Sequence, residues 1–116
     1  MKALNLIEKG LSLEGWQGEV VAELGDVVAR LFHLTPNKEM VMDEEGHEVN
    51  EWIVVLQGEV KVQTSHGNLV LKTGDSFIMP PGYSHRLNVD KPAIGLIVRD
   101  MKKAPTHPIP GAVVDR

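Results

Sequence analysis

The chain is organised around one stretch, residues 45–58, which reads EGHEVNEWIVVLQG. Side chains on an extended strand alternate between its two faces with a period of two. If the whole stretch is extended, Glu45, His47 and Glu51 lie on the same face as the odd-numbered apolar residues. Burying unpaired charges on such a face is costly. The pattern therefore leaves two interpretations open, a bound cation or a loop exposed to water.

A second stretch, residues 74–88, reads GDSFIMPPGYSHRLN and places one histidine after a run of turn-forming residues. Gly74, Pro80 and Gly82 favour turns, because glycine tolerates positive φ and proline fixes its own φ. We expect their role to be structural. His85 lies in a strand predicted over residues 84–89, and it is the residue of this stretch that we expect to carry chemistry.

Together the two stretches resemble the two motifs of the cupin superfamily, G-x5-H-x-H-x(3,4)-E-x6-G and G-x5-P-x-G-x2-H-x3-N. The first motif aligns with Glu39, Glu45, His47, Glu51 and Gly58, so glutamates stand at its opening glycine and at its first histidine. The second aligns with Gly74, Pro80, Gly82 and His85, with Asn88 one place early. The resemblance covers roughly residues 26–99 and is to small single-domain cupins of the type-2 conserved barrel.

The resemblance implies an all-β fold, the double-stranded β-helix or jelly-roll barrel. It also implies one divalent metal ion in the barrel, held by Glu45, His47, Glu51 and His85. Imidazole and carboxylate ligands suit Fe, Mn, Ni or Zn, and a glutamate in place of a histidine makes the site more anionic. Family members that have lost the metal serve as binding modules, so the replacement at Glu45 leaves metal binding open.

Each candidate residue also has a plainer interpretation. Five acidic residues fall between positions 43 and 51, and such a run is typical of a solvated loop, which would remove Glu45 from the site. Glu51 could instead be a buried carboxylate paired with Arg86, Arg99 or Arg30. His85 could be a packed imidazole bonded to a backbone carbonyl. Tyr83 and His33 are candidates to line a pocket, with core or structural roles as the alternatives.

Alternating apolar residues and turn signals predict many short strands, as in a sandwich or barrel. We expect strands over residues 19–24, 27–34, 52–56, 60–64, 69–71, 77–79, 84–89 and 93–98, and no helix. The whole chain, 1–116, is predicted to be one cupin domain with a motif-bearing barrel at 26–99. Residues 1–18 are expected to form a loose arm, and residues 102–116 a proline-rich tail.

The composition of the chain limits the classes of function that it can have. The chain has 116 residues, 42% hydrophobic and 24% charged, which suits one globular domain. Its net charge of −4 disfavours nucleic-acid binding, and it has no cysteine for disulfides or thiolate sites. No stretch resembles a signal peptide or a membrane helix, which predicts a cytoplasmic protein with no membrane partner. Family habit and the two loose ends predict a homodimer.

Two hypotheses for the function of the protein follow, and both assume that it binds a small molecule. In the first, the protein is a metalloenzyme with dioxygenase-like or isomerase-like activity. In the second, it is a non-catalytic binding or sensor module for a small molecule or carbohydrate, with or without a metal. A third interpretation, a structural or partner-binding β-domain, requires His47 and His85 to point to opposite faces of the barrel wall. The fold alone does not choose among these hypotheses.

Overall fold

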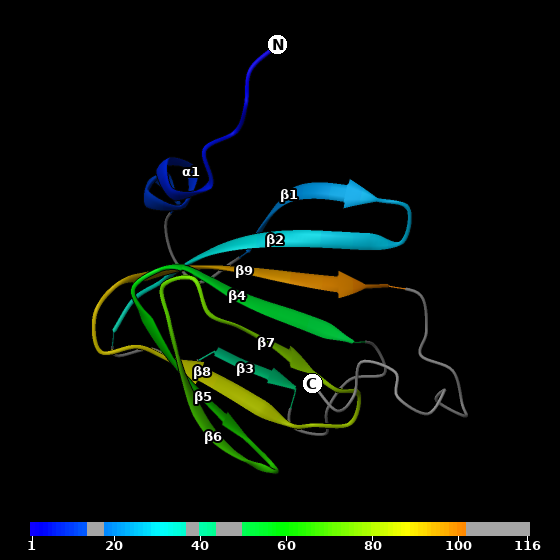
Figure 1. Cartoon of the computed structure of the whole chain (residues 1–116), viewed down its shortest axis with the longest axis vertical. Coiled ribbons are helices and arrows are strands. Elements are labelled where there is room, and N and C mark those ends of the chain that lie inside the picture. Colours follow the sequence, from blue (N-terminus) through cyan, green and yellow to red (C-terminus); the bar gives the residue numbers. More distant parts are fainter. Residues whose placement is uncertain (14–17, 37–39, 44–49, 102–116) are drawn as a thin grey trace.

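The computed structural model describes residues 1–13, 18–36, 40–43 and 50–101. These residues form two antiparallel sheets that face each other and one short helix (Figure 1). The elements are α1 (Leu6–Ser12), β1 (Glu19–Leu24), β2 (Val27–Leu34), β3 (Met40–Asp43), β4 (Glu51–Gln57), β5 (Glu59–Thr64), β6 (Gly67–Lys72), β7 (Ser76–Met79), β8 (His85–Asn88) and β9 (Ala93–Asp100).

The strands form a jelly-roll barrel. The larger sheet has the order β1-β2-β9-β4-β7, and the smaller has the order β3-β8-β5-β6. All pairs are antiparallel, and β4 lies between β9 and β7, which are distant in the sequence. The all-β fold predicted from the sequence is confirmed. The eight predicted strands are all present, while β3 was not expected as a strand.

Gly58 allows the chain to pass from β4 in one sheet to β5 in the other. Its φ is 100°, a conformation that side chains with a Cβ rarely adopt. A Cβ at this position would lie 2.9 Å from the Cβ of Ala93. The last glycine of the first motif is therefore required by both backbone conformation and packing.

Apolar side chains from both sheets meet inside the barrel. The alternation of exposed and buried residues along β4 and β5 places one face of each strand in this core. Burying one such side chain contributes about 1.5–3 kcal/mol. The cluster comprises Phe32, Leu34, Ile53, Val55, Val60, Val62, Leu71, Met79, Leu87, Val89, Ala93 and Ile97. This core fixes which face of each strand points inward.

The prediction of no helix was wrong for residues 6–12. The side chain of Asn5 accepts hydrogen bonds from the backbone N–H groups of Ile7 and Glu8, which caps α1. The helix packs on the larger sheet, where Gly10 is buried against Ile94. A helix this short depends on such packing, which local sequence patterns do not reveal. No helix in the described part of the chain is long and apolar enough to cross a membrane.

The contact between α1 and the sheet predicts a measurable cost for Gly10→Val. A Cβ at Gly10 would lie 2.6 Å from the buried Cγ2 of Ile94, so the helix must shift. We expect the free energy of unfolding in urea to fall by about 1–3 kcal/mol. The control is Glu8→Val, which places the same side chain at an exposed position of the same helix. Equal, small losses in both variants would contradict the docked position of α1.

Candidate functional site

Glu51 begins β4 and faces the inside of the barrel. Glu51, Ile53 and Val55 are at most 2% exposed, whereas Trp52 is 45% exposed. The predicted alternation is therefore confirmed for the described part of this stretch. Backbone pairing places Glu51 beside Arg99 of β9 on one side and beside β7 on the other. An acidic side chain thus lies within the core at one end of the barrel.

Two side chains compensate the Glu51 carboxylate. The Nε–H of Arg99 donates to Oε2 of Glu51 at 2.6 Å, and Nε2 of His85 lies 3.2 Å from Oε1. The side chains of Glu51 and His85 are fully buried, and that of Arg99 is 29% exposed. Removing a carboxylate from water is costly, and a charge-assisted hydrogen bond to arginine offsets that cost. Of the three arginines considered as partners, the structure pairs Glu51 with Arg99.

The orientation of His85 is fixed by its other ring nitrogen. Nδ1 lies 3.0 Å from the backbone carbonyl oxygen of Tyr83. A carbonyl can only accept a hydrogen bond, so Nδ1 carries the hydrogen. In the neutral ring, Nε2 then directs a lone pair at the carboxylate of Glu51. Two acceptors in contact repel each other, so this contact needs either a proton on Nε2 or a cation shared with Oε1.

The two described candidates for metal ligation fit one ion in part. Glu51 and His85 offer a carboxylate oxygen and an imidazole nitrogen 3.2 Å apart. Two ligands bound at about 2.0–2.2 Å to the same ion are separated by roughly this distance. A backbone carbonyl bonded to the far nitrogen of a histidine is also typical of metal sites.

The remaining proposed ligands, Glu45 and His47, lie outside the described residues. Among the residues that are described, no three or more His, Cys, Asp or Glu side chains are grouped so that they could hold a metal ion. The two-residue contact of Glu51 and His85 is therefore the part of the predicted metal site that the structure brings together.

The side chains of the two pocket candidates make their observed contacts with residues other than Glu51. Tyr83 is partly buried against the core, and its ring stacks on that of His66 with centroids 3.8 Å apart. Tyr83 contacts His85 through its backbone carbonyl, which accepts the hydrogen bond from Nδ1, and not through its hydroxyl. His33 contacts the carbonyl of Leu13 through Nδ1 at 3.2 Å. By alternation along β2, His33 faces away from the barrel core, so it does not line the inner site.

A cavity beside Arg99 was not anticipated from the sequence. Its volume is about 130 Å³, and it is lined by Val28, Arg30, Phe32, Ile97, Arg99 and Met101. Arg30 shares the inner face of β2 with Phe32 and Leu34. The sequence therefore did contain an indication of this cavity, because Arg30 is an even-numbered residue of β2, like the core residues Phe32 and Leu34.

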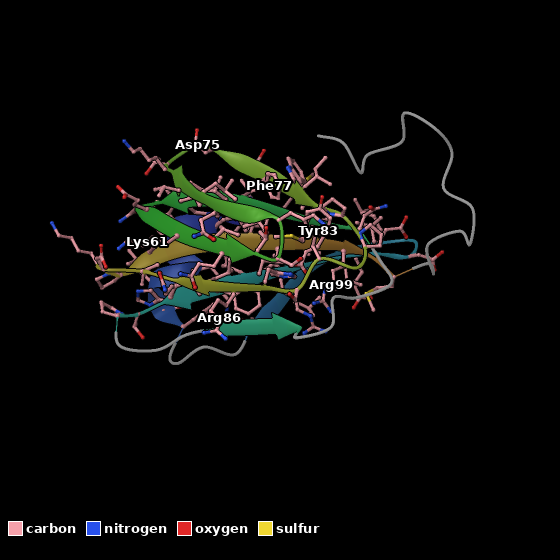
Figure 2. All side chains as sticks on the ribbon, turned by 90° about the horizontal axis from the view of Figure 1, so that it is seen from below. Lys61, Asp75, Phe77, Tyr83, Arg86 and Arg99 are labelled. Atoms are coloured by element: carbon pink, nitrogen blue, oxygen red, sulfur yellow. The ribbon has the colours of Figure 1, made fainter. Side chains whose placement is uncertain are left out.

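A wider cleft of about 520 Å³ opens near Lys61 and Lys91. It lies at the ends of the strands opposite to Glu51, and Figure 2 shows Lys61 toward one end of the barrel and Tyr83 and Arg99 toward the other. Of the predicted site residues that the structure describes, none lines this cleft. We therefore place the candidate site at the end that contains Glu51, His85 and Arg99.

The sequence as a whole identifies the family. A family model described as a cupin domain matches residues 30–99, which is more than half of the chain. The chain therefore belongs to the cupin domain family. The matched region includes Glu51, His85 and Arg99, so the buried network lies within the part of the chain that defines the family.

Solved structures share this fold. A cupin-2 domain containing protein from Shewanella frigidimarina aligns with a TM-score of 0.71 and 23% identity, over 82% of this chain and 91% of that one. A conserved protein with a double-stranded β-helix domain from Klebsiella pneumoniae aligns with a TM-score of 0.71 and 25% identity, over 90% and 94% of the two chains. KdgF from Halomonas aligns with a TM-score of 0.65 and 19% identity, over 78% and 90%. Among curated proteins, none matches the sequence.

The buried pair predicts strong coupling between Glu51 and Arg99. We expect Arg99→Met to lower the free energy of unfolding by about 2–4 kcal/mol, because it leaves a buried carboxylate without its cation. Adding Glu51→Gln removes that stranded charge and should restore at least about 1 kcal/mol. Urea unfolding in the presence of a chelator measures both. Strictly additive losses would contradict the pairing.

The control for this cycle is Lys61→Met, which breaks an exposed ion pair. Lys61 Nζ lies 2.8 Å from Asp90 Oδ2, and both side chains are largely in water, so we expect little change in stability. The hydrogen bond to Asp90 raises the pKa of Lys61 above its ordinary value of 10.5. The stabilisation by this pair is therefore fully present at neutral pH, below the ordinary lysine pKa of 10.5, and is lost only as the pH rises through the raised pKa of Lys61. It stays constant through the neutral range.

Proposed function

We propose that the protein binds one divalent metal ion inside the barrel and a small organic molecule beside it. The observation that carries this proposal is the contact between Nε2 of His85 and Oε1 of Glu51, because the Tyr83 carbonyl fixes the hydrogen on Nδ1. A divalent ion held by both groups would replace the repulsion between these two acceptors with two attractions. Family membership supports the proposal. His47 and Glu45 are the further ligands proposed, with Glu45 standing where the motif has its first histidine.

In this proposal the described residues have distinct tasks. His85 and Glu51 bind the ion, the Tyr83 carbonyl orients the imidazole, and Arg99 fixes the second carboxylate oxygen. The ion, when bound, would supply Lewis-acid chemistry. A dioxygenase-like or isomerase-like conversion of a small molecule requires an open position on that ion. Oxygen uptake by the iron-loaded protein with candidate substrates tests the first of these reactions.

A second candidate is a metal-free binding module. The observation that favours it is the 2.6 Å bond from Arg99 to Glu51, which already compensates the negative charge of the carboxylate. A proton on His85 Nε2 would then complete the network, and the interior would bind a ligand without turnover. The two candidates differ in metal content, which makes them separable by one analysis.

Metal analysis of the untagged protein tests the proposal. We expect about one equivalent of a single metal in the wild type and its loss in His85→Ala, since that variant removes a buried ligand. The matched control is His66→Ala, which removes an exposed histidine of the β5–β6 turn and should keep the metal. Absence of metal from the wild type, even after reconstitution, would contradict the proposal and favour the metal-free module.

Thermal unfolding provides an independent measurement. A ligand that binds the folded state alone raises its stability in proportion to the logarithm of ligand concentration over Kd. We therefore expect His85→Ala to lower Tm more in metal-replete than in chelator-treated protein. Equal losses under both conditions would show that His85 only packs.

We further propose that the protein is a homodimer that covers the free edge of β1. This strand is exposed along most of its length, and in the described residues it pairs with β2 alone. Leu24 is 75% exposed and Val20 is 38% exposed. Exposed edges of this kind are usually covered or blocked by charge.

Light scattering measures the mass of the protein in solution. We expect twice the mass of one chain for the wild type. The double variant Val20→Lys/Leu24→Lys should shift the mass toward one chain, because added charge opposes pairing along β1. A wild-type mass of one chain would contradict the homodimer, and a dimer unaffected by the two lysines would place the interface elsewhere.

A further inference from the structure

A cavity between Arg30 and Arg99 adjoins the buried contacts of Glu51 with His85 and Arg99. It is lined by residues that, apart from Arg99, take no part in those contacts. Its volume is about 130 Å³, which suits a ligand much smaller than a drug-sized molecule. Two arginines and four apolar side chains line it, namely Val28, Arg30, Phe32, Ile97, Arg99 and Met101. Arg99 is thus the residue shared by the cavity and the Glu51 carboxylate.

Strand register brings the two arginines together. Arg30 lies opposite Ile97 in the pairing of β2 with β9, and Arg99 is two residues further along β9. Such diagonal neighbours point to the same face of a sheet and lie within reach of each other when the side chains are long. Both guanidinium groups can therefore contact one small group in the cavity.

The guanidinium groups retain donors for a ligand. Arg99 uses its Nε–H on Glu51, and a guanidinium has five N–H donors in all. Arg30 is exposed and makes no ion pair within the residues that the structure describes. Glu23, on the same face of the neighbouring strand β1, is exposed and is not bonded to Arg30 there. Buried Glu51 balances Arg99. Among the described residues no acidic side chain is bonded to Arg30, so its positive charge is uncompensated there.

We propose that this cavity binds the carboxylate group of a small organic acid. Arginine N–H groups match the two oxygens of a carboxylate in a planar, bidentate arrangement. One uncompensated charge matches a monoanion better than a dianionic phosphate. The apolar walls formed by Val28, Phe32 and Ile97 favour a ligand with a short hydrocarbon body over a bare inorganic anion. The substrate class is thus a small aliphatic carboxylate.

This inference rests on the proposed function for the role of the ligand, but it does not depend on a metal for binding. The cavity residues are not metal-ligand candidates, and Arg99 is held by a hydrogen bond within the protein. Carboxylate binding is therefore expected in chelator-treated protein as well as in metal-loaded protein. This separates failure of the inference from failure of the proposed function.

The test follows the Nε–Hε resonances of the arginines by nuclear magnetic resonance. Acetate, isobutyrate, uncharged isobutyramide and inorganic phosphate are titrated into the full chain, with chelator and then with zinc. We expect saturable shifts at Arg30 and Arg99 with both carboxylates, tighter binding of isobutyrate than of acetate, and no saturable shift with isobutyramide. Arg30→Gln should weaken isobutyrate binding at least about tenfold.

The matched control is Arg86→Gln, which removes an exposed arginine from β8 and should leave isobutyrate binding unchanged. Arg30→Lys keeps the charge but not the planar donors, and we expect it to bind with intermediate affinity. Equal binding of the amide, tighter binding of phosphate, no effect of Arg30→Gln, or no saturable shift with either carboxylate would overturn the inference. Carboxylate binding in a protein that takes up no metal would support the inference and contradict the metal proposal alone.

Discussion

A carboxylate buried inside a β-barrel must be compensated by positive charge, and this constraint governs the end of the barrel at which Glu51 lies. Arg99 supplies a full charge from β9, and His85 approaches from β8 in the other sheet. Glu51 and His85 belong to different motifs and lie 34 residues apart in sequence, and the two motifs meet at this carboxylate. The network therefore connects the sheets at a position where apolar packing alone would exclude an acid.

The two oxygens of the Glu51 carboxylate have different partners, Arg99 for Oε2 and His85 for Oε1, and the proposed site depends on this difference. Oε2 accepts a short, charge-assisted hydrogen bond, whereas Oε1 faces a nitrogen whose lone pair is directed by the Tyr83 carbonyl. A proton on Nε2, or a metal ion held by both groups, would remove the repulsion between these two acceptors. The neighbouring cavity adds Arg30, so ion and ligand would occupy adjacent positions that share Arg99 as a fixed element.

The sequence predicted those parts of the fold that depend on local pattern. Alternation located the strands and the inward face of Glu51, and the resemblance to the cupin motifs implied that His85 lies beside it. The choice among three arginines could not be predicted, because it depends on the pairing of β4 with β9, 48 residues away in sequence. Helix α1 was missed, since a helix of seven residues depends on packing against β2 and β9, which local sequence does not reveal. The place of Arg30 on the same face of β2 as Phe32 and Leu34 became clear only once the core established the faces of that strand.

The nitrogen-15 spectrum of the His85 ring, recorded during titration with the diamagnetic ion zinc, reports directly on whether Glu51 and His85 share a metal ion. We expect Nδ1 to stay protonated throughout, because it donates to the Tyr83 carbonyl. We also expect the Nε2 signal to move to a metal-bound shift and to saturate at one equivalent. An Nε2 signal that stays unchanged while the exposed His66 responds would contradict a metal ion shared by Glu51 and His85.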